Sequence, residues 1–277
     1  MIKPQGIAET VARALAEDVG TGDLSAALIP TETTAHALVI SRRPAIIAGS
    51  PWFDEVFRQL DKRVTVDWRV QQGQPVKAGA AICDVQGPAR ALLTGERVAL
   101  NFLQLLSATA TAAHSFVEVV KGTSAVILDT RKTLPGLRAA QKYAVTCGGA
   151  RNHRMGLFDA ILIKENHIAA AGSISAIVSA ARRRHPDINI EVEVEHIGQI
   201  EEALAAGANI ILLDNFTLVD LKTAVELNDG RARLEVSGGV SLRDIRAIAQ
   251  TGVDYISVGA LTKNIAAIDL SMRIAIQ

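Results

Sequence analysis

Basic side chains that could bind an anion gather in the middle of the chain, each at or just after a short apolar run. They are Arg131, Lys132, His153, Arg154 and Lys164. Arginine matches carboxylate and phosphate oxygens with paired hydrogen bonds, whereas lysine offers a compact charge. Like charges held close together repel one another unless an anion neutralises them. We therefore expect a pocket for a polyanion, and a solvated surface patch is the less favoured alternative.

Acidic residues follow in the next two apolar runs. Glu191, Glu193 and Glu195 alternate along one run and so share a face, while Asp214 ends the following run. Carboxylates inside a fold need a metal, a lysine or ribose hydroxyls as partners. Oxygen ligands without clustered Cys or His favour Mg²⁺ brought by a phosphorylated substrate over zinc. A lattice of salt bridges with the basic residues is the structural alternative.

Two later runs end in small residues that suit a phosphate site. The residues are Ser237, Gly238 and Gly239 after the first run, and Ser257, Val258 and Gly259 after the second. Glycines let backbone N–H groups approach an anion near the start of a helix, which we expect close to Ser241. Ordinary helix caps are the alternative for each serine taken singly.

These polar ends must be brought together by the elements that precede them. Six short runs, nearly continuous in Val, Ile and Leu, alternate with helical stretches; they cover residues 125–129, 160–164, 188–194, 209–214, 233–237 and 254–258. Strands of this kind are typical of a parallel sheet covered on both faces. In a βα barrel the carboxyl ends of the strands converge on the face that carries the active site. The sequence thus predicts an α/β fold with an incomplete or open parallel α/β barrel of the TIM-like kind.

A different texture precedes the barrel. A helix is predicted over residues 7–17, short β-branched runs lie between residues 34 and 85, and a long helix is predicted over residues 92–120. We expect an N-terminal α/β open-sandwich domain over residues 1–112 and a barrel domain over residues 113–265. Residues 266–277 should pack back on the first domain.

The composition of the chain limits the kinds of partner that we expect it to bind. Of 277 residues, 29 are Lys or Arg and 29 are Asp or Glu, so no basic field favours nucleic acid and a small-molecule partner is expected. The two cysteines, Cys83 and Cys147, have no CxxC spacing, which predicts packed, reduced thiols. No apolar leader and no run of roughly 20 apolar residues is present, which predicts a cytoplasmic protein without a membrane partner.

The segment over residues 129–168 reads DTRKTLPGLRAAQKYAVTCGGARNHRMGLFDAILIKENHI, and it resembles the core signature of quinolinate phosphoribosyltransferases of the type II fold. Further blocks occur in the order of that family: EDVGTGDLS at 17–25, ERVALNFLQLLSATAT at 96–111, EVEVE at 191–195, LLDNF at 212–216, LEVSGG at 234–239 and ISVGALTK at 256–263. The resemblance runs from the N-terminal helix to the end of the barrel.

The resemblance implies phosphoribosyl transfer from phosphoribosyl pyrophosphate to quinolinate. The products are nicotinate mononucleotide, pyrophosphate and CO₂, and Mg²⁺ is the cofactor of this step in NAD biosynthesis. It places Arg131, His153, Arg154 and Lys164 on quinolinate, with Arg97 supplied by a neighbouring subunit. It places the following residues on phosphoribosyl pyrophosphate: Lys132, Glu193, Asp214, Ser237, Gly238, Gly239, Ser257, Val258 and Gly259. Thr130 is a further expected substrate-binding residue.

Among these residues, Lys132, Glu193 and Asp214 are expected to be catalytic, and Glu193 and Asp214 are the candidate Mg²⁺ ligands. Glu191 and Glu195 remain alternatives to Glu193. A homodimer with a shared active site follows from the role of Arg97, and assembly of dimers into a hexamer is an open alternative.

Three other functions remain to be weighed. A related pyrophosphorylase associated with molybdate transport would use another acceptor, and an aldolase would form a Schiff base on Lys164. A metabolite-binding protein would keep the fold without the chemistry. His167 is interpreted as a core imidazole in preference to an orienting residue.

Overall fold

The structure is a computed structural model that describes residues 4–276 of the chain. Contacts within the chain divide it into two compact units. The first contains the residues up to 114, residues 133–149 and the residues from 260 onward, and the second contains residues 115–132 and 150–259.

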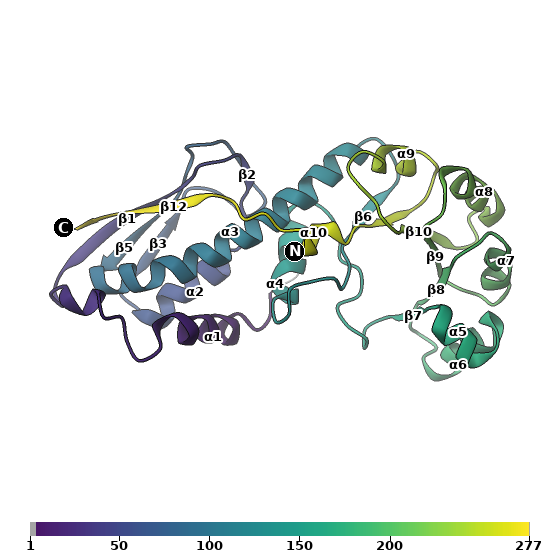
Figure 1. Ribbon diagram of the computed structural model, residues 1–277, viewed down its shortest axis with the longest axis horizontal. Helices are drawn as coiled ribbons and strands as arrows, with labels where there is room; N and C mark the ends of the chain where they lie inside the picture. The colour runs from purple at the N-terminus through teal and green to yellow at the C-terminus, as the bar shows by residue number, and fades with distance from the viewer. Residues whose placement is uncertain (1–3, 277) are drawn as a thin grey trace. The chain divides into compact units, whose positions relative to one another are not determined.

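The first unit is built on an antiparallel sheet with the strand order β12-β1-β5-β3 (Figure 1). Its strands are β1 (Thr34–Ser41), β3 (Thr65–Trp68), β5 (Ala81–Pro88) and β12 (Leu270–Ile276). A further pair is formed by β2 (Ala45–Ile46) and β4 (Pro75–Val76). The helices are α1 (Ile7–Val19), the short 3₁₀ helix η1 (Ala26–Leu28), α2 (Ser50–Leu60), α4 (Arg138–Cys147) and most of α3 (Ala89–Val120).

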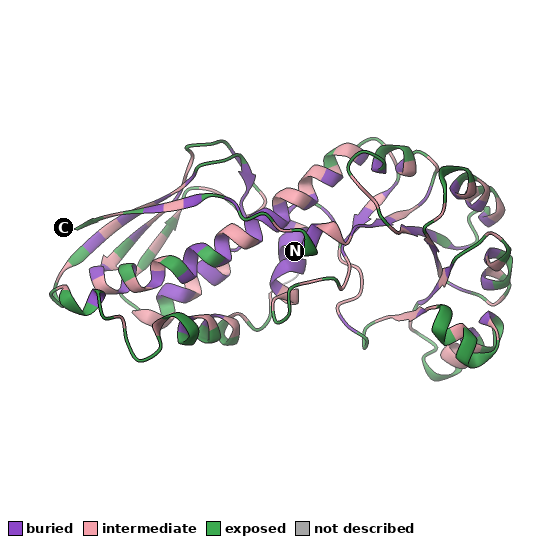
Figure 2. Ribbon diagram, viewed as in Figure 1, coloured by how far each residue is buried: buried purple, intermediate pink, exposed green. Residues whose placement is uncertain are grey.

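The side chains of β1 alternate between buried and more exposed positions, which shows that one face of this sheet is covered. Ala35, Ala37 and Val39 are fully buried and join a core with Phe53 and Phe57 of α2. Figure 2 colours the ribbon by burial and shows buried positions in both the sheet and the helices of this unit. A strand with side chains alternating between two faces buries one set and exposes the other. The predicted N-terminal α/β sandwich is confirmed, although α2 was not foreseen.

The second unit is a six-stranded parallel sheet with the strand order β6-β11-β10-β9-β8-β7 (Figure 1). Its strands are β6 (Val126–Leu128), β7 (Ile161–Ile163), β8 (Ile190–Val194), β9 (Ile210–Asp214), β10 (Arg233–Ser237) and β11 (Tyr255–Ser257). The helices that connect them are α5 (Glu165–Ala171), α6 (Ile174–Arg184), α7 (Gly198–Ala205), α8 (Leu218–Asn228) and α9 (Ile245–Ala249). The edge strands β6 and β7 do not pair with each other, so the predicted open parallel barrel is confirmed.

The register of this sheet brings polar strand ends into one layer. Ser237 at the end of β10 lies opposite Asp214 at the end of β9, and Ser257 ends β11 opposite Leu128 of β6. Parallel strands that follow one another through helical crossovers all point the same way. The polar groups that follow each apolar run therefore gather at one end of the barrel.

One segment that the sequence groups with the barrel makes its contacts elsewhere. Residues 133–149, which include α4, belong to the first unit, where the backbone of Gly148 approaches that of α3. A Cβ on Gly148 would lie 2.3 Å from the carbonyl oxygen of Ala110, so only glycine permits this approach. The short helix α10 (Ala260–Lys263) and strand β12 also belong to the first unit, and β12 pairs with β1.

Over the described residues, no helix combines the length and the apolar character that a membrane span requires.

Candidate active site

A cavity of about 300 Å³ lies at the carboxyl ends of the parallel strands of the second unit. It is lined by Thr130, Arg131, Lys132, His153, Arg154, Leu162, Lys164, Glu193, Leu212, Glu235, Ser237 and Ser257. Nine of the residues predicted for the site are among them. The strand ends of a βα barrel form its functional face, so this cavity is the candidate active site.

The remaining predicted residues lie outside the lining. Asp214 is close enough to Glu193 for its charge to act on that carboxyl, and Gly259 packs against the side chain of Lys132. Gly238 adopts a positive φ of 100° beside Asn215. Val258 is buried, and its N–H donates to the carbonyl oxygen of Leu128.

Two further expectations concern Arg97 and Ser241. Arg97 belongs to the first unit, where its side chain is largely exposed on α3. The helix expected near Ser241 begins at Ile245, after a turn in which the Ser241 hydroxyl donates to Asp244. The segment 237–239, which the sequence predicts to bind phosphate, is thus followed by a turn. The helix α9 after that turn starts a few residues later than predicted.

An ion pair joins the basic and acidic sides of the pocket. The ammonium group of Lys164, at the end of β7, donates to Oε2 of Glu193 on β8. Burial raises the pKa of the Glu193 carboxyl, although the lysine acts in the opposite direction. Burial is the larger effect, which indicates that the carboxyl is poorly solvated and that Lys164 offsets only part of the cost.

The basic side chains repel one another, as the sequence suggested. The pKa of Arg154 is lowered by burial and by the nearby charge of Arg131. A guanidinium group that is destabilised in this way gains free energy when an anion binds beside it. The electrostatics of the pocket therefore favour a negatively charged ligand.

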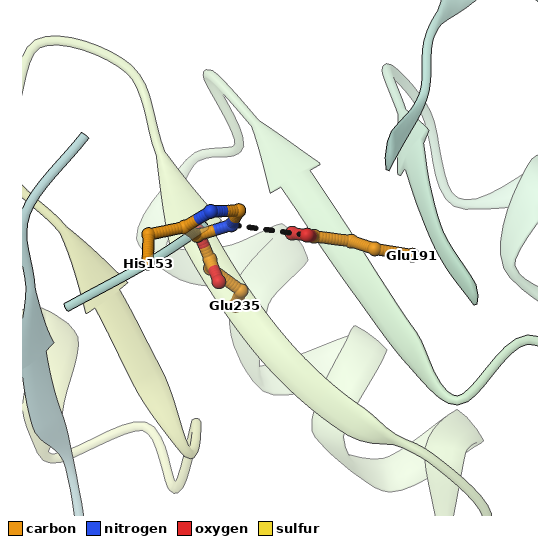
Figure 3. A group of neighbouring side chains, drawn as sticks. All are labelled: His153, Glu191 and Glu235. Atoms are coloured by element: carbon orange, nitrogen blue, oxygen red, sulfur yellow. Dashed lines mark ion pairs between the residues drawn. The ribbon is translucent and has the colours of Figure 1, made fainter. Parts of the chain in front are cut away.

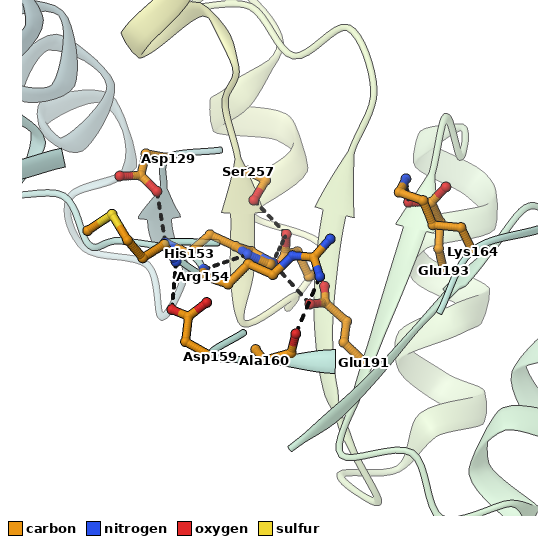
Figure 4. A network of polar contacts seen from close by, with 11 residues as sticks. Asp129, His153, Arg154, Asp159, Ala160, Lys164, Glu191, Glu193 and Ser257 are labelled. Atoms are coloured by element: carbon orange, nitrogen blue, oxygen red, sulfur yellow. Dashed lines mark hydrogen bonds and ion pairs between the residues drawn. The ribbon is translucent and has the colours of Figure 1, made fainter. Parts of the chain in front are cut away.

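The segment that carries His153 and Arg154 is held by a buried aspartate at the end of β6 (Figure 4). Asp129 is fully buried, and its two oxygens accept hydrogen bonds from the backbone N–H of His153 at 2.9 Å and the Asn152 amide at 2.7 Å. The Arg154 guanidinium donates to the carbonyl oxygen of Ala160. Asp129 thus sets the path of the segment before any ligand binds.

Beneath the pocket, the His153 ring meets two buried carboxyl groups (Figure 3). Its Nε2 atom lies 3.0 Å from Oε2 of Glu191 on β8 and 3.6 Å from Oε1 of Glu235 on β10. The Ser257 hydroxyl donates to the same oxygen of Glu235 at 2.5 Å. Both glutamates are almost completely buried.

Two buried carboxyl groups this close cannot both be ionised without a large cost. Burial, followed by the charge of Glu191, raises the pKa of Glu235 to about 8. His153 and Ser257 act in the opposite direction but do not offset it. Glu235 is therefore the protonated member of the pair at neutral pH.

His153, Glu191 and Glu235 also place their potential ligand atoms within 4.8 Å of one another. The backbone N–H of Arg154, however, donates to Nδ1 of His153 at 2.7 Å, so Nδ1 must be an acceptor. A neutral imidazole then carries its proton on Nε2, which is the atom that faces the carboxyl groups. This arrangement favours a hydrogen-bonded cluster over a metal site.

Sequence reasoning missed Glu235 as a member of the pocket and was wrong about His167. A charged residue in the middle of an apolar parallel strand was the available signal for Glu235. His167 is exposed, and its Nδ1 accepts the backbone N–H of Lys164 at the start of α5. Of the three alternating glutamates, only Glu193 lines the pocket, since Glu191 of β8 lies in the buried cluster and Glu195, just after β8, is exposed.

Comparison with known proteins covers nearly the whole chain. Residues 23–107 match the quinolinate phosphoribosyl transferase N-terminal domain, and residues 109–273 match the corresponding C-terminal domain. The nicotinate-nucleotide pyrophosphorylase [carboxylating] of Mycobacterium leprae is 44% identical over 95% of both chains.

Solved structures agree with this match. The nicotinate-nucleotide pyrophosphorylase of Francisella tularensis superposes with a TM-score of 0.95 at 46% identity, covering 97% of this chain and 96% of that one. The enzyme of Ehrlichia chaffeensis gives a TM-score of 0.94 at 36% identity, covering 99% of this chain and 100% of that one.

An antiparallel sandwich joined to an open parallel barrel, with a cationic pocket at the strand ends, defines a class of barrel enzymes that act on anionic substrates. Within that class, the chain belongs to the quinolinate phosphoribosyltransferase family.

The shared proton of the buried cluster should be visible in the pH dependence of stability. Because the folded protein holds the Glu235 proton more tightly than the unfolded chain, the free energy of unfolding should fall as the pH rises from about 5 to about 8. Glu235→Gln is neutral throughout and should lose about 2–4 kcal/mol less than the wild type over this window. Chemical denaturation at a series of pH values measures the difference.

The matched control is Glu201→Gln, which removes an exposed carboxylate paired with Arg231. Its pH dependence between 5 and 8 should equal that of the wild type. Equal slopes for the wild type and Glu235→Gln would show that Glu235 is already ionised at neutral pH.

Proposed function

We propose that the chain transfers the phosphoribosyl group of phosphoribosyl pyrophosphate to quinolinate and removes one carboxylate. It thereby makes nicotinate mononucleotide, pyrophosphate and CO₂ for NAD biosynthesis. The observation that carries the proposal is the cationic pocket at the carboxyl ends of the barrel strands, in a chain whose full length matches this family. A dicarboxylate and a pyrophosphate are together the kind of ligand that such a pocket stabilises.

Quinolinate is assigned to the side of the pocket formed by Arg131, His153, Arg154 and Lys164. The repulsion between Arg131 and Arg154 supports this assignment, since two carboxylates would relieve it. Leu162 supplies an apolar wall of the same cavity, which suits an aromatic ring. Arg97 is assigned to quinolinate from the neighbouring subunit.

Phosphoribosyl pyrophosphate is assigned to the remaining predicted residues. They are Thr130, Lys132, Glu193, Asp214, Ser237, Gly238, Gly239, Ser257, Val258 and Gly259. The Thr130 hydroxyl accepts the backbone N–H of Lys132 at 3.1 Å, which orients the turn after β6. The positive φ of Gly238 and Gly239 leaves their backbone open to a phosphate without a Cβ in the way.

Glu193 and Asp214 fit a Mg²⁺ ion as oxygen ligands, and the charge of Asp214 acts on Glu193 across the pocket edge. Glu193 is already engaged by Lys164, which suits an ion that arrives with the phosphorylated substrate better than a resident one. When bound, the ion would neutralise charge that builds up on the departing pyrophosphate.

The residues of the chain then divide the reaction between them. Lys132 takes up negative charge on the leaving pyrophosphate, while Glu193 and Asp214 position the ribose and stabilise its anomeric carbon as that carbon becomes cationic. The basic side chains hold quinolinate so that its ring nitrogen faces that carbon. After N-ribosylation the positively charged ring accepts the electron pair left by CO₂, so no further cofactor is needed.

A homodimer with a shared active site follows from the assignment of Arg97, whose side chain is exposed on α3. Dimers alone and dimers assembled into a hexamer are both compatible with that assignment. Two buried, unlinked cysteines support a reducing compartment, and we place the protein in the cytoplasm.

The direct test is an assay of nicotinate mononucleotide made from quinolinate and phosphoribosyl pyrophosphate. Equal amounts of mononucleotide, pyrophosphate and CO₂ are expected, with activity lost after chelation of divalent ions and restored by Mg²⁺. Nicotinate and other pyridine acids serve as control acceptors. Turnover of one of these acids with none of quinolinate would assign the chain another acceptor, and borohydride trapping of Lys164 would favour an aldolase.

Arg154→Ala should weaken quinolinate binding by about 10- to 100-fold, because a charge-assisted hydrogen bond contributes about 1.5–3 kcal/mol. The affinity for phosphoribosyl pyrophosphate should change little. Calorimetric titration with each substrate measures both constants, and Arg231→Ala, which removes an exposed arginine paired with Glu201, is the control. Unchanged quinolinate affinity would remove Arg154 from this role.

Arg97→Ala and Lys132→Ala proteins should each be inactive alone and regain activity when mixed. A mixed dimer contains one site with both residues intact, so random exchange should restore about one quarter of the wild-type rate. Exchange of subunits is verified independently by mass spectrometry of labelled chains. Absence of recovery after proven exchange would argue against a shared site.

A further inference from the structure

A second cavity lies at the opposite end of the barrel interior. Its volume is about 260 Å³, and its wall includes Asn189 before β8, Ile210 at the start of β9 and Tyr255 at the start of β11. Three residues, His153, Arg154 and Glu235, line both this lower cavity and the active-site pocket. The buried cluster therefore lies between a substrate pocket and a separate space at the amino ends of the strands.

Glu235 is the member of the cluster that has a proton to give. Its Oε1 atom accepts the hydroxyl of Ser257, so the proton of the neutral carboxyl resides on Oε2. Oε2 is shielded from solvent, and a hydrogen bond between the Glu235 and Glu191 carboxyl groups holds the proton within the cluster. Glu191 also accepts the Nε2–H group of His153, at 3.0 Å (Figure 3).

The reaction needs one proton at the floor of the pocket. When the carboxylate beside the ring nitrogen leaves as CO₂, its bonding electron pair stays on the ring carbon, and a proton must take the place of the carboxyl group. Arginine does not release protons near neutral pH, and Lys164 is engaged by Glu193. A buried neutral carboxyl that lines the pocket is better matched to the task.

We propose that Glu235 donates the proton that replaces the departing carboxylate and is reprotonated by water through the lower cavity. The carbon–carboxylate bond breaks, CO₂ leaves, and the electron pair on the ring carbon takes the proton from Oε2. The resulting Glu235 carboxylate keeps the hydrogen bond from Ser257 and then takes a proton from water, so one water proton is consumed per turnover. This step rests on the quinolinate reaction proposed above.

The cluster is tuned for such a cycle by the groups that face Glu235 from each neighbouring element. Glu191 on β8 favours the protonated form, while His153 on the segment before β7 and Ser257 on β11 favour the carboxylate that appears after donation. The pKa of about 8 lies near the operating pH, where a general acid is both protonated and able to donate.

Glu235→Gln tests the proposal, because glutamine keeps the shape and the contact with Ser257 but has no acidic proton. In a single-turnover rapid-quench experiment, pyrophosphate should appear at the wild-type rate. Nicotinate mononucleotide should form about 100-fold more slowly. The carboxylated nucleotide, already ribosylated on nitrogen, should accumulate between the two events. Glu235→Asp keeps an acid and should recover part of the lost rate.

Three results would overturn the proposal. If both variants released pyrophosphate and formed mononucleotide equally slowly, Glu235 would have only a structural role. If neither rate changed, another group would donate the proton. Failure of the wild type to make nicotinate mononucleotide would remove the reaction itself, which separates that error from an error about Glu235. Glu201→Gln, on the surface of the same unit, serves as the control with unaltered kinetics, and thermal melting verifies that every variant is folded.

Discussion

The cost of burying charge without a partner governs the arrangement of the second unit. Parallel strands buried on both faces carry Glu191 and Glu235 into the barrel interior, where neither carboxyl can be hydrated. Glu191 accepts the imidazole N–H of His153, Glu235 accepts the hydroxyl of Ser257, and the pKa of Glu235 is raised by burial and by the charge of Glu191. In the pocket above them, the charge of Arg131 destabilises the Arg154 guanidinium, and a bound anion would relieve that repulsion. A protonated carboxyl group therefore lies at the base of the pocket, and basic side chains lie at its opening.

This layering depends on tight control of one irregular segment. The backbone between residues 150 and 160 carries both His153 and Arg154, and a buried aspartate fixes it through two hydrogen bonds. The Arg154 N–H group in turn selects the tautomer of His153. A single carboxylate thus settles where the arginine points and which ring nitrogen bears the proton. This short segment therefore positions both Arg154, which is assigned to the substrate, and His153, which contacts the buried carboxyl groups.

The sequence predicted most of the barrel because that signal is local. Each strand is a continuous apolar run with a polar end, and strand direction alone brings Arg131, Lys164 and Glu193 together. The role of Glu235 was not predicted, since it depends on which face of β10 meets a loop distant in sequence. The sequence also did not predict that residues 133–149 belong to the first unit, because the apolar pattern of a helix does not show which hydrophobic core the helix packs against. Quinolinate itself came from the resemblance, whereas the charges alone indicated only an anionic ligand.

The first unit is assembled from segments on both sides of the barrel, and this has a consequence for biosynthesis. Strand β1 is flanked by β5, which precedes the barrel in the chain, and by β12, which follows it. During synthesis, the edge of β1 that pairs with β12 stays unpaired until the barrel and then β12 have been translated. An unpaired strand edge invites association with other chains. The interval between synthesis of β1 and synthesis of β12 is therefore the period in which the unpaired edge of β1 is open to association with other chains.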